Sequence, residues 1–341
     1  MKRILSVALS IILAFAVVIP MTSCGRANST QSSQFVREDV VVRNFVDERF
    51  EFVALAARIA GFAHHSLTTT DYHRRLDAAF LHFQDHEAIQ AVFTLHGWMD
   101  IFSFASILEI TEDGFALRDL NTYRSDMQLR HDYNRLQSLV NYLNVLHRDT
   151  NFRAFFNNEE NQRYFMRIST DFVQNVYRYI NFEWFEQFGF DPDNMHVILM
   201  PSLVLGGGIG QWIFDEDYNL KIAYSILGPG SMTNYITTIH EFAHAFANPL
   251  AAQWHSSCLD FWALTRETHQ RGFVDPAYAT TRIVAYEYVT RAFTILYFAD
   301  NSDRNIQALF QIDRMHGFRN IREVFDMLMR YLGRYELIQL S

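Results

Sequence analysis

The stretch SMTNYITTIHEFAHAFANPL, residues 231–250, constrains the fold most, because it places ionisable groups in a segment that is otherwise apolar or small. It contains no glycine, and its only proline is Pro249. The sequence therefore predicts a helix that Ser231 caps and that Pro249 ends. His240 and His244 are four residues apart, so they lie on one side of this helix, where both imidazoles can face one metal ion.

Glu241 completes the pattern H-E-x-x-H. It lies about a third of a turn from His240, near the metal position but off its axis. There its carboxylate can hold a metal-bound water and accept its proton, which is the role of a general base. A chance match is expected in roughly a few per cent of chains with this many histidines, so the surrounding sequence has to support the motif. Three ionisable groups on a buried helix are costly unless they meet a metal.

The third metal ligand has to come from another helix. A third histidine six residues after His244 is absent because Leu250 occupies that place, which excludes the metzincin pattern H-E-x-x-H-x-x-G-x-x-H. Glu287 lies among apolar residues in TTRIVAYEYVTRAFTILYF, and we favour it because a buried acid needs a partner. Glu267, in the polar stretch WALTRETHQRG, is the alternative ligand. Arg291, four residues after Glu287, could also form an ordinary helix ion pair with it.

A motif H-E-x-x-H followed by a helical glutamate resembles the gluzincin metallopeptidases. More narrowly, VILMPSLVLGGGIG, HEFAHAFANP, EYVTRAFT and HGFRNIREVFDML are similar to a family of bacterial secreted lipoproteins that carry a domain of unknown function. The resemblance implies that His240, His244 and Glu287 bind one zinc ion per chain and that Glu241 is the base. Many gluzincins carry an aspartate where this chain has Arg291, which leaves the residue that stabilises the oxyanion open. The candidates are Arg291, Tyr286, Tyr288 and His255.

The N-terminus indicates where the protein is located. Cys24 follows a positively charged start, an apolar run and two small residues, which is typical of a bacterial lipoprotein signal. We expect residues 1–23 to be removed, Cys24 to be lipidated and residues 24–36 to form a flexible tether. The protein would then be anchored in the bacterial cell envelope, on a membrane face that the sequence does not determine. An uncleaved N-terminal membrane anchor is the alternative.

Composition narrows the class of protein further. The formal net charge is −9, and the only two lysines are Lys2 and Lys221, so nucleic acid is not an expected partner. With Cys24 lipidated, Cys258 is the only thiol left and no internal disulfide can form. The fold must therefore rest on its core, for which 49% hydrophobic residues and 31 phenylalanines are ample.

The expected fold class is α+β, predominantly helical, with a small central sheet next to the motif helix. We expect residues 37–190 to form a helical portion and residues 191–341 a zincin-like catalytic portion, continuous with the first. HVILMPSLVL predicts a buried strand, and QWIFDEDYNLKIAYSIL predicts two short strands around an acidic turn. The glycines at 206–210 either let the backbone form a tight turn or hairpin or let it lie close to another chain. In the second case SLVLGGGIG or KIAYSIL would align an extended peptide by backbone pairing.

These features predict a membrane-anchored zinc metallopeptidase. A zinc-activated water would attack a peptide bond of a peptide or protein substrate, with Glu241 as the general base. One alternative is a zincin-like binding or scaffold lipoprotein without catalysis. Another is a zinc amidohydrolase that acts on a non-peptide substrate of the envelope, such as a cell-wall crosslink.

Overall fold

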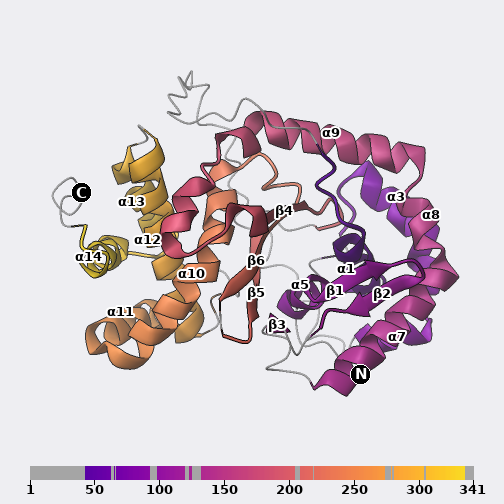
Figure 1. The fold of residues 1–341 in the computed structure, drawn as a ribbon, viewed down its shortest axis with the longest axis horizontal. Coiled ribbons are helices and arrows are strands. Elements are labelled where there is room, and N and C mark those ends of the chain that lie inside the picture. The colour runs from indigo at the N-terminus through magenta and orange to yellow at the C-terminus, as the bar shows by residue number, and fades with distance from the viewer. Residues whose placement is uncertain are drawn as a thin grey trace, which may run out of the picture. The chain divides into compact units, whose positions relative to one another are not determined.

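Helices form most of the described chain, and two small sheets lie among them (Figure 1), which confirms the predicted α+β class. The computed structural model describes residues 43–62, 65, 67–92, 98–119, 123–124, 132–203, 208–217, 219–272, 278, 280–302 and 305–334. The predicted signal, Cys24 and the tether lie outside this part of the chain. Residues 33–341 belong to one unit, to which all the elements below belong. No helix in the described part is long and apolar enough to span a bilayer.

The first half of the chain is mainly helical, as predicted. Side chains start several of its helices: Asp47 accepts a hydrogen bond from the N–H of Arg49, and Asn158 accepts one from Asn161. The helices are α1 (Glu48–Ile59), α3 (Asp71–Phe80), η3 (Leu81–Phe83), α4 (Glu87–Val92), α5 (Trp98–Ser106), α7 (Tyr133–Thr150), α8 (Phe152–Phe156), α9 (Glu159–Asn175), η4 (Tyr177–Tyr179), η5 (Glu183–Phe188) and η6 (Pro192–Asn194).

One element of this half was not predicted from the sequence. Strands β1 (Leu108–Thr111) and β2 (Gly114–Leu117) form an antiparallel hairpin. Its sequence signal is the pair Asp113-Gly114 between two short apolar runs, because Gly114 adopts a φ of 146° that other residues avoid.

The central sheet has the strand order β3-β5-β6-β4. Strands β5 (Gly208–Asp215) and β6 (Leu220–Leu227) are antiparallel around the predicted acidic turn, and β4 (Met195–Leu199) runs parallel to β6. The short β3 (Tyr123–Arg124) pairs only with the end of β5. Within the predicted strand HVILMPSLVL, β4 therefore covers only the residues up to Leu199, because Pro201 cannot continue a ladder of hydrogen bonds.

The sheet separates two groups of helices. The motif helix α10 (Tyr235–Ser257) packs on one face of β5 and β6. On the other face the ring of Phe50 in α1 lies 5.5 Å from that of Tyr224, and Ser103 in α5 donates a hydrogen bond to Gln211 at 2.7 Å. The helices of the first half and the motif helix thus share one sheet.

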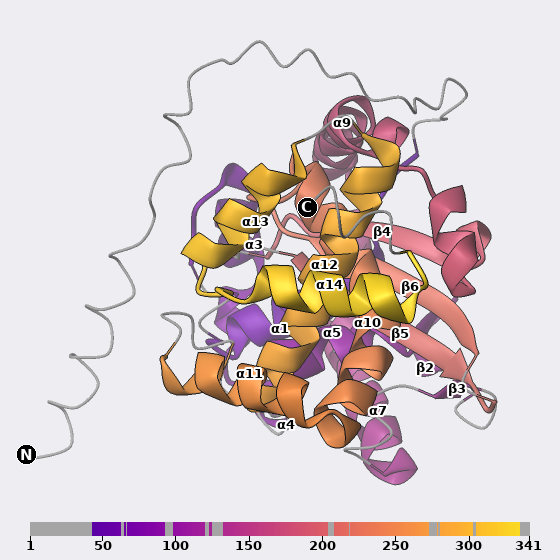
Figure 2. The ribbon, with the colours of Figure 1, turned by 90° about the vertical axis from the view of Figure 1, so that its left-hand side faces the viewer.

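The remaining helices enclose the motif helix from the other side. Helix α10 packs most extensively against α12 (Thr281–Asn301). In this contact the ring centres of Phe246 and Phe293 are 4.3 Å apart. Figure 2 looks onto the helices that pack against α12. These are α11 (Leu259–Gln270), α13 (Ile306–Met315) and α14 (Ile321–Tyr331).

Two predictions about the motif helix are wrong. Its cap is Asn234, whose side chain accepts from the N–H groups of Ile236 and Thr237, while Ser231 lies in the preceding turn. Asn234 serves because it stands directly before the first helical residue, with an extended backbone.

Pro249 also does not end the motif helix but lies inside it. A proline there removes one backbone hydrogen bond and costs about 3 kcal/mol. The helix continues because its last two turns are apolar on one side: Leu250, Ala251 and Trp254 are all buried. Burying side chains of this size contributes about as much as the proline costs.

Candidate metal centre

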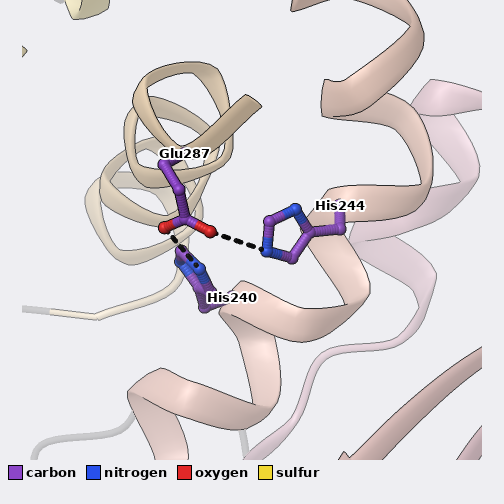
Figure 3. A group of neighbouring side chains, drawn as sticks. All are labelled: His240, His244 and Glu287. Atoms are coloured by element: carbon purple, nitrogen blue, oxygen red, sulfur yellow. Dashed lines mark ion pairs between the residues drawn. The ribbon is translucent and has the colours of Figure 1, made fainter. Parts of the chain in front are cut away.

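His240 and His244 lie one turn apart on α10 and face Glu287 of α12 (Figure 3). Nε2 of His240 is 3.5 Å from Oε2 of Glu287, and Nε2 of His244 is 3.4 Å from Oε1. One ligand atom from each side chain lies within 4.8 Å of the others. Two ligands bound at about 2.0–2.2 Å in tetrahedral geometry are about 3.3–3.6 Å apart. The three side chains are therefore placed so that they could hold one metal ion.

Glu241 faces the same place without belonging to the group of three. It is 6% exposed, and its Oε2 is 3.9 Å from Nε2 of His244. Burial, aided by the charge of Glu287, raises the pKa of Glu241 to about 7, although His240 and the backbone N–H of Gly210 act in the opposite direction. A carboxyl group with this pKa can accept and release a proton near neutral pH.

Strand β5 reaches the motif helix because it begins with glycines. A Cβ atom on Gly208 would lie 2.6 Å from Cγ of Glu241, and one on Gly210 would lie 2.5 Å from the carbonyl oxygen of Glu241. Only glycine allows this approach. The contact of Gly208 and Gly210 with the motif helix was not predicted from the sequence; Gly206 and Gly207 are outside the described residues.

His244 is held from behind by two residues that sequence analysis missed. Its Nδ1 is 3.0 Å from Oγ1 of Thr290 and 3.1 Å from Oδ1 of Asn248. With Nδ1 as donor to these oxygens, Nε2 is left with a free lone pair that points towards Glu287. Burial lowers the pKa of His244 to about 4, which favours the neutral imidazole that a metal needs. Helical spacing was the available signal, since Asn248 is four residues after His244 and Thr290 is three after Glu287.

Arg291 holds Glu287 from the other side. Its Nη2 is 3.3 Å from Oε2 of Glu287, and its Nη1 donates to Oδ1 of Asp313 at 2.5 Å. The guanidinium group also lies 4.2 Å from the ring centre of Phe318. Burial alone would raise the pKa of Glu287, but the hydrogen bond with His240 and the charges around it keep that pKa well below its usual range. Glu287 is therefore ionised at neutral pH, as a metal ligand must be.

The alternative ligand Glu267 is not part of this group. Its side chain is 52% exposed and forms an ion pair with Arg271 on the same helix. This is the ordinary pairing expected of a solvated helix face.

Three of the four candidates for the oxyanion position form no hydrogen bond or ion pair with the group of three among the described residues. The hydroxyl of Tyr288 is 2.8 Å from Oγ1 of Thr268 in α11, and that of Tyr286 accepts a hydrogen bond from Arg282. His255 belongs to the last turns of α10, beyond the metal ligands. Arg291, the fourth candidate, forms an ion pair with Glu287.

No protein-family model, curated protein or solved structure matches this chain.

Proposed function

We propose that the chain is a zinc-dependent metallopeptidase of the gluzincin type, held in the bacterial cell envelope by lipid on Cys24. One observation carries the proposal: the carboxylate of Glu287 meets both imidazoles of the H-E-x-x-H motif at 3.4 and 3.5 Å. Two imidazoles and one carboxylate are one of the donor sets of catalytic zinc sites. No other cluster of three or more metal-ligating side chains is found in the described part of the chain.

The residues of the centre have different roles in the proposed hydrolysis. His240, His244 and Glu287 would hold the ion, and zinc in such a site polarises a carbonyl group and lowers the pKa of water. Glu241 accepts the proton of the attacking water and passes it to the leaving nitrogen, a role that suits a pKa of about 7. Thr290 and Asn248 keep Nε2 of His244 available, and Arg291 keeps Glu287 in place.

Strand β5 supports a peptide as the substrate. One side of its first residues pairs with β6, and the other side has no partner strand within the described part of the chain until β3 meets Phe214. Strand β6, the second candidate from the sequence, lies between β5 and β4 and has no free edge. An extended peptide could add to β5 by backbone hydrogen bonds, directly beside Glu241.

The test combines metal analysis with cleavage. We expect the purified full chain, produced in zinc-containing medium, to hold about one zinc per chain and to cleave members of a diverse peptide library. Glu241→Gln should keep the zinc and reduce cleavage by about 10²–10⁴-fold, because it removes the base but no ligand. Glu267→Gln serves as the control and should change neither.

Each other outcome has a definite meaning. Absence of bound zinc contradicts the proposal. Zinc without cleavage of any peptide favours the binding or scaffold alternative, and cleavage of cell-wall amides but not peptides favours the amidohydrolase. Cleavage that survives Glu241→Gln contradicts the mechanism.

A further inference from the structure

A cleft lies on the face of the central sheet opposite the metal centre. Ser225 of β6 faces the motif helix, where its hydroxyl donates to the carbonyl of Thr238. Successive side chains of a strand point to opposite faces, so Tyr224 faces the other way, towards Phe50 of α1. The cleft, of about 410 Å³, lies beside Tyr224 and His196, its partner in β4.

The charged side chains that line this cleft are mostly positive. They are Arg43, Arg49 and Arg118, with Asp47 as the only acid. Asp47 is already paired with Arg49, at 2.7 Å between its Oδ2 and Nη2. The cleft therefore keeps an excess of positive charge in a chain whose formal net charge is −9.

The three arginines differ in how many hydrogen bonds and ion pairs they already form within the protein. Arg118 donates to the hydroxyl of Tyr224 at 3.3 Å and pairs with Glu109, which is 51% exposed, at 3.3 Å. Arg43 has no ion pair with a described residue; its guanidinium group lies 5.2 Å from the ring centre of Phe45. Arg43 is thus the group with most hydrogen-bond donors to offer a ligand.

The positive charges of all three arginines affect the imidazole of His196. Burial lowers the pKa of His196, and the charges of Arg43, Arg49 and Arg118 lower it further. An anion placed there would relieve this repulsion and could accept a hydrogen bond from the imidazole.

A second arginine-lined cleft provides a contrast. The cleft of about 600 Å³ between α3 and α9 also has three arginines, but Asp71 and Glu160 line it too. There Arg75 is bonded to Glu160 at 3.1 Å and to Asn161. Three arginines and two acids leave its lining more nearly balanced than that beside His196, which has three arginines and one acid.

We propose that the cleft beside His196 binds a small organic molecule that carries an oxyanion, either a phosphate monoester or a carboxylate. Arg43 and His196 would donate to the oxyanion, and Arg49 and Arg118 would contribute charge from positions that the protein itself fixes. Ile198 and Ile222 provide apolar surface for the rest of the molecule. This site is separate from the metal centre and does not depend on the proposed hydrolysis.

The proposal is tested by calorimetric titration of the full chain with phenyl phosphate and with benzoate, which distinguish the two oxyanions. Sodium chloride keeps the ionic strength constant, and EDTA prevents binding through metal. We expect saturable binding of at least one probe and about a tenfold loss of affinity in Arg43→Gln, the effect of one lost charged hydrogen bond. Arg163→Gln, in the cleft between α3 and α9, is the matched control and should bind as the wild type does.

His196→Gln is a second variant and should also weaken binding. Because Arg43 is exposed, its replacement leaves the hydrogen bonds of Arg49 and Arg118 intact. Failure of both probes to bind would overturn the proposal, as would equal affinities in Arg43→Gln, His196→Gln and the wild type.

Discussion

Among the side chains of the metal centre, the imidazole of His244 has the best-defined orientation. Thr290 and Asn248 both contact Nδ1, so rotation of the ring would break two hydrogen bonds in a buried place. In metal sites such outer contacts fix the tautomer of the ligand and raise its basicity. In this chain a neutral hydroxyl and a neutral amide make these outer contacts.

Removing the hydroxyl of Thr290 should weaken metal binding. Thr290→Val keeps the shape of the side chain but leaves Nδ1 of His244 with Asn248 alone, so we predict about a tenfold lower affinity for zinc. A competition titration with a chelator measures it. Thr294→Val, one turn further along α12, removes a hydroxyl that bonds only the carbonyl of Thr290 and should leave the affinity unchanged. Equal affinities in the two variants would show that Thr290 does not orient the ligand.

The role of a single residue in the site could be predicted where it followed from residues close to it in the sequence. His240 and His244 share a helix face by periodicity alone. The choice of Glu287 over Glu267 rested on burial, and in the structure the side chain of Glu287 is 14% exposed whereas that of Glu267 is 52% exposed. The contact of Thr290 with His244 depends on the distance between α10 and α12, which no local pattern specifies.

At the scale of elements, the motif helix shows packing overriding a local stop signal. Pro249 is exposed, so its ring contributes little to the core, while Leu250, Ala251 and Trp254 after it are buried. The proline is visible in the sequence, but the residues that stabilise the helix after it come from elsewhere in the chain. One of them is Phe261, whose ring lies 5.6 Å from that of Trp254.

Replacing this proline should therefore stabilise the protein. Pro249→Ala restores a backbone donor and a good helix former, and we predict a free energy of unfolding that is higher by about 1–3 kcal/mol. Urea unfolding measures this change. Gln253→Ala, at another exposed position of the helix, is the control and should have an effect within about 0.5 kcal/mol. A destabilised Pro249→Ala variant would mean that the helix needs its proline.

The contact between β5 and α10 is the second element-scale feature, and it is sensitive to a single methyl group. Gly210→Ala would place Cβ 2.5 Å from the backbone oxygen of Glu241 and 3.1 Å from Cβ of His244. The strand would have to move away, so we predict a loss of about 1–3 kcal/mol in the free energy of unfolding and lower zinc affinity. Gly208→Ala meets the side chains of Glu241 and Thr237, which can rotate, so it should affect cleavage more than stability. An unchanged unfolding curve for Gly210→Ala would contradict the close packing.

At the scale of the whole molecule, the first helices and the segment before β5 are joined by a buried acid. Glu51 of α1 accepts hydrogen bonds from the hydroxyl of Tyr72 at 2.9 Å and from the hydroxyl of Ser202 at 3.0 Å. The sequence predicted a helical portion up to residue 190 and a catalytic portion after it, but Glu51 has contacts on both sides of that division. Such long-range contacts have no sequence pattern, which is why only the order of helices and strands could be predicted and not their packing.

Glu51 should make the stability of the protein depend on pH. Burial raises its pKa to about 7, above the ordinary value of 4.5 that it has in the unfolded chain. Below pH 4.5 the carboxyl group is protonated in both states, so its contribution to stability is fully present. As pH rises to about 7 the unfolded chain releases the proton first, and the wild type loses up to about 3 kcal/mol.

Glu51→Gln mimics the protonated acid and has no such loss. Relative to the wild type, its free energy of unfolding should rise between pH 4 and pH 8 by up to about 3 kcal/mol, as measured by urea unfolding at several pH values. Glu48→Gln is the control of opposite sign. Burial alone would raise the pKa of Glu48, but hydrogen bonds with His147 and Arg153 lower it, so the wild type gains stability from this acid above its unfolded pKa. Parallel pH profiles for Glu51→Gln and the wild type would show that the pKa of Glu51 is the same in the folded and the unfolded protein.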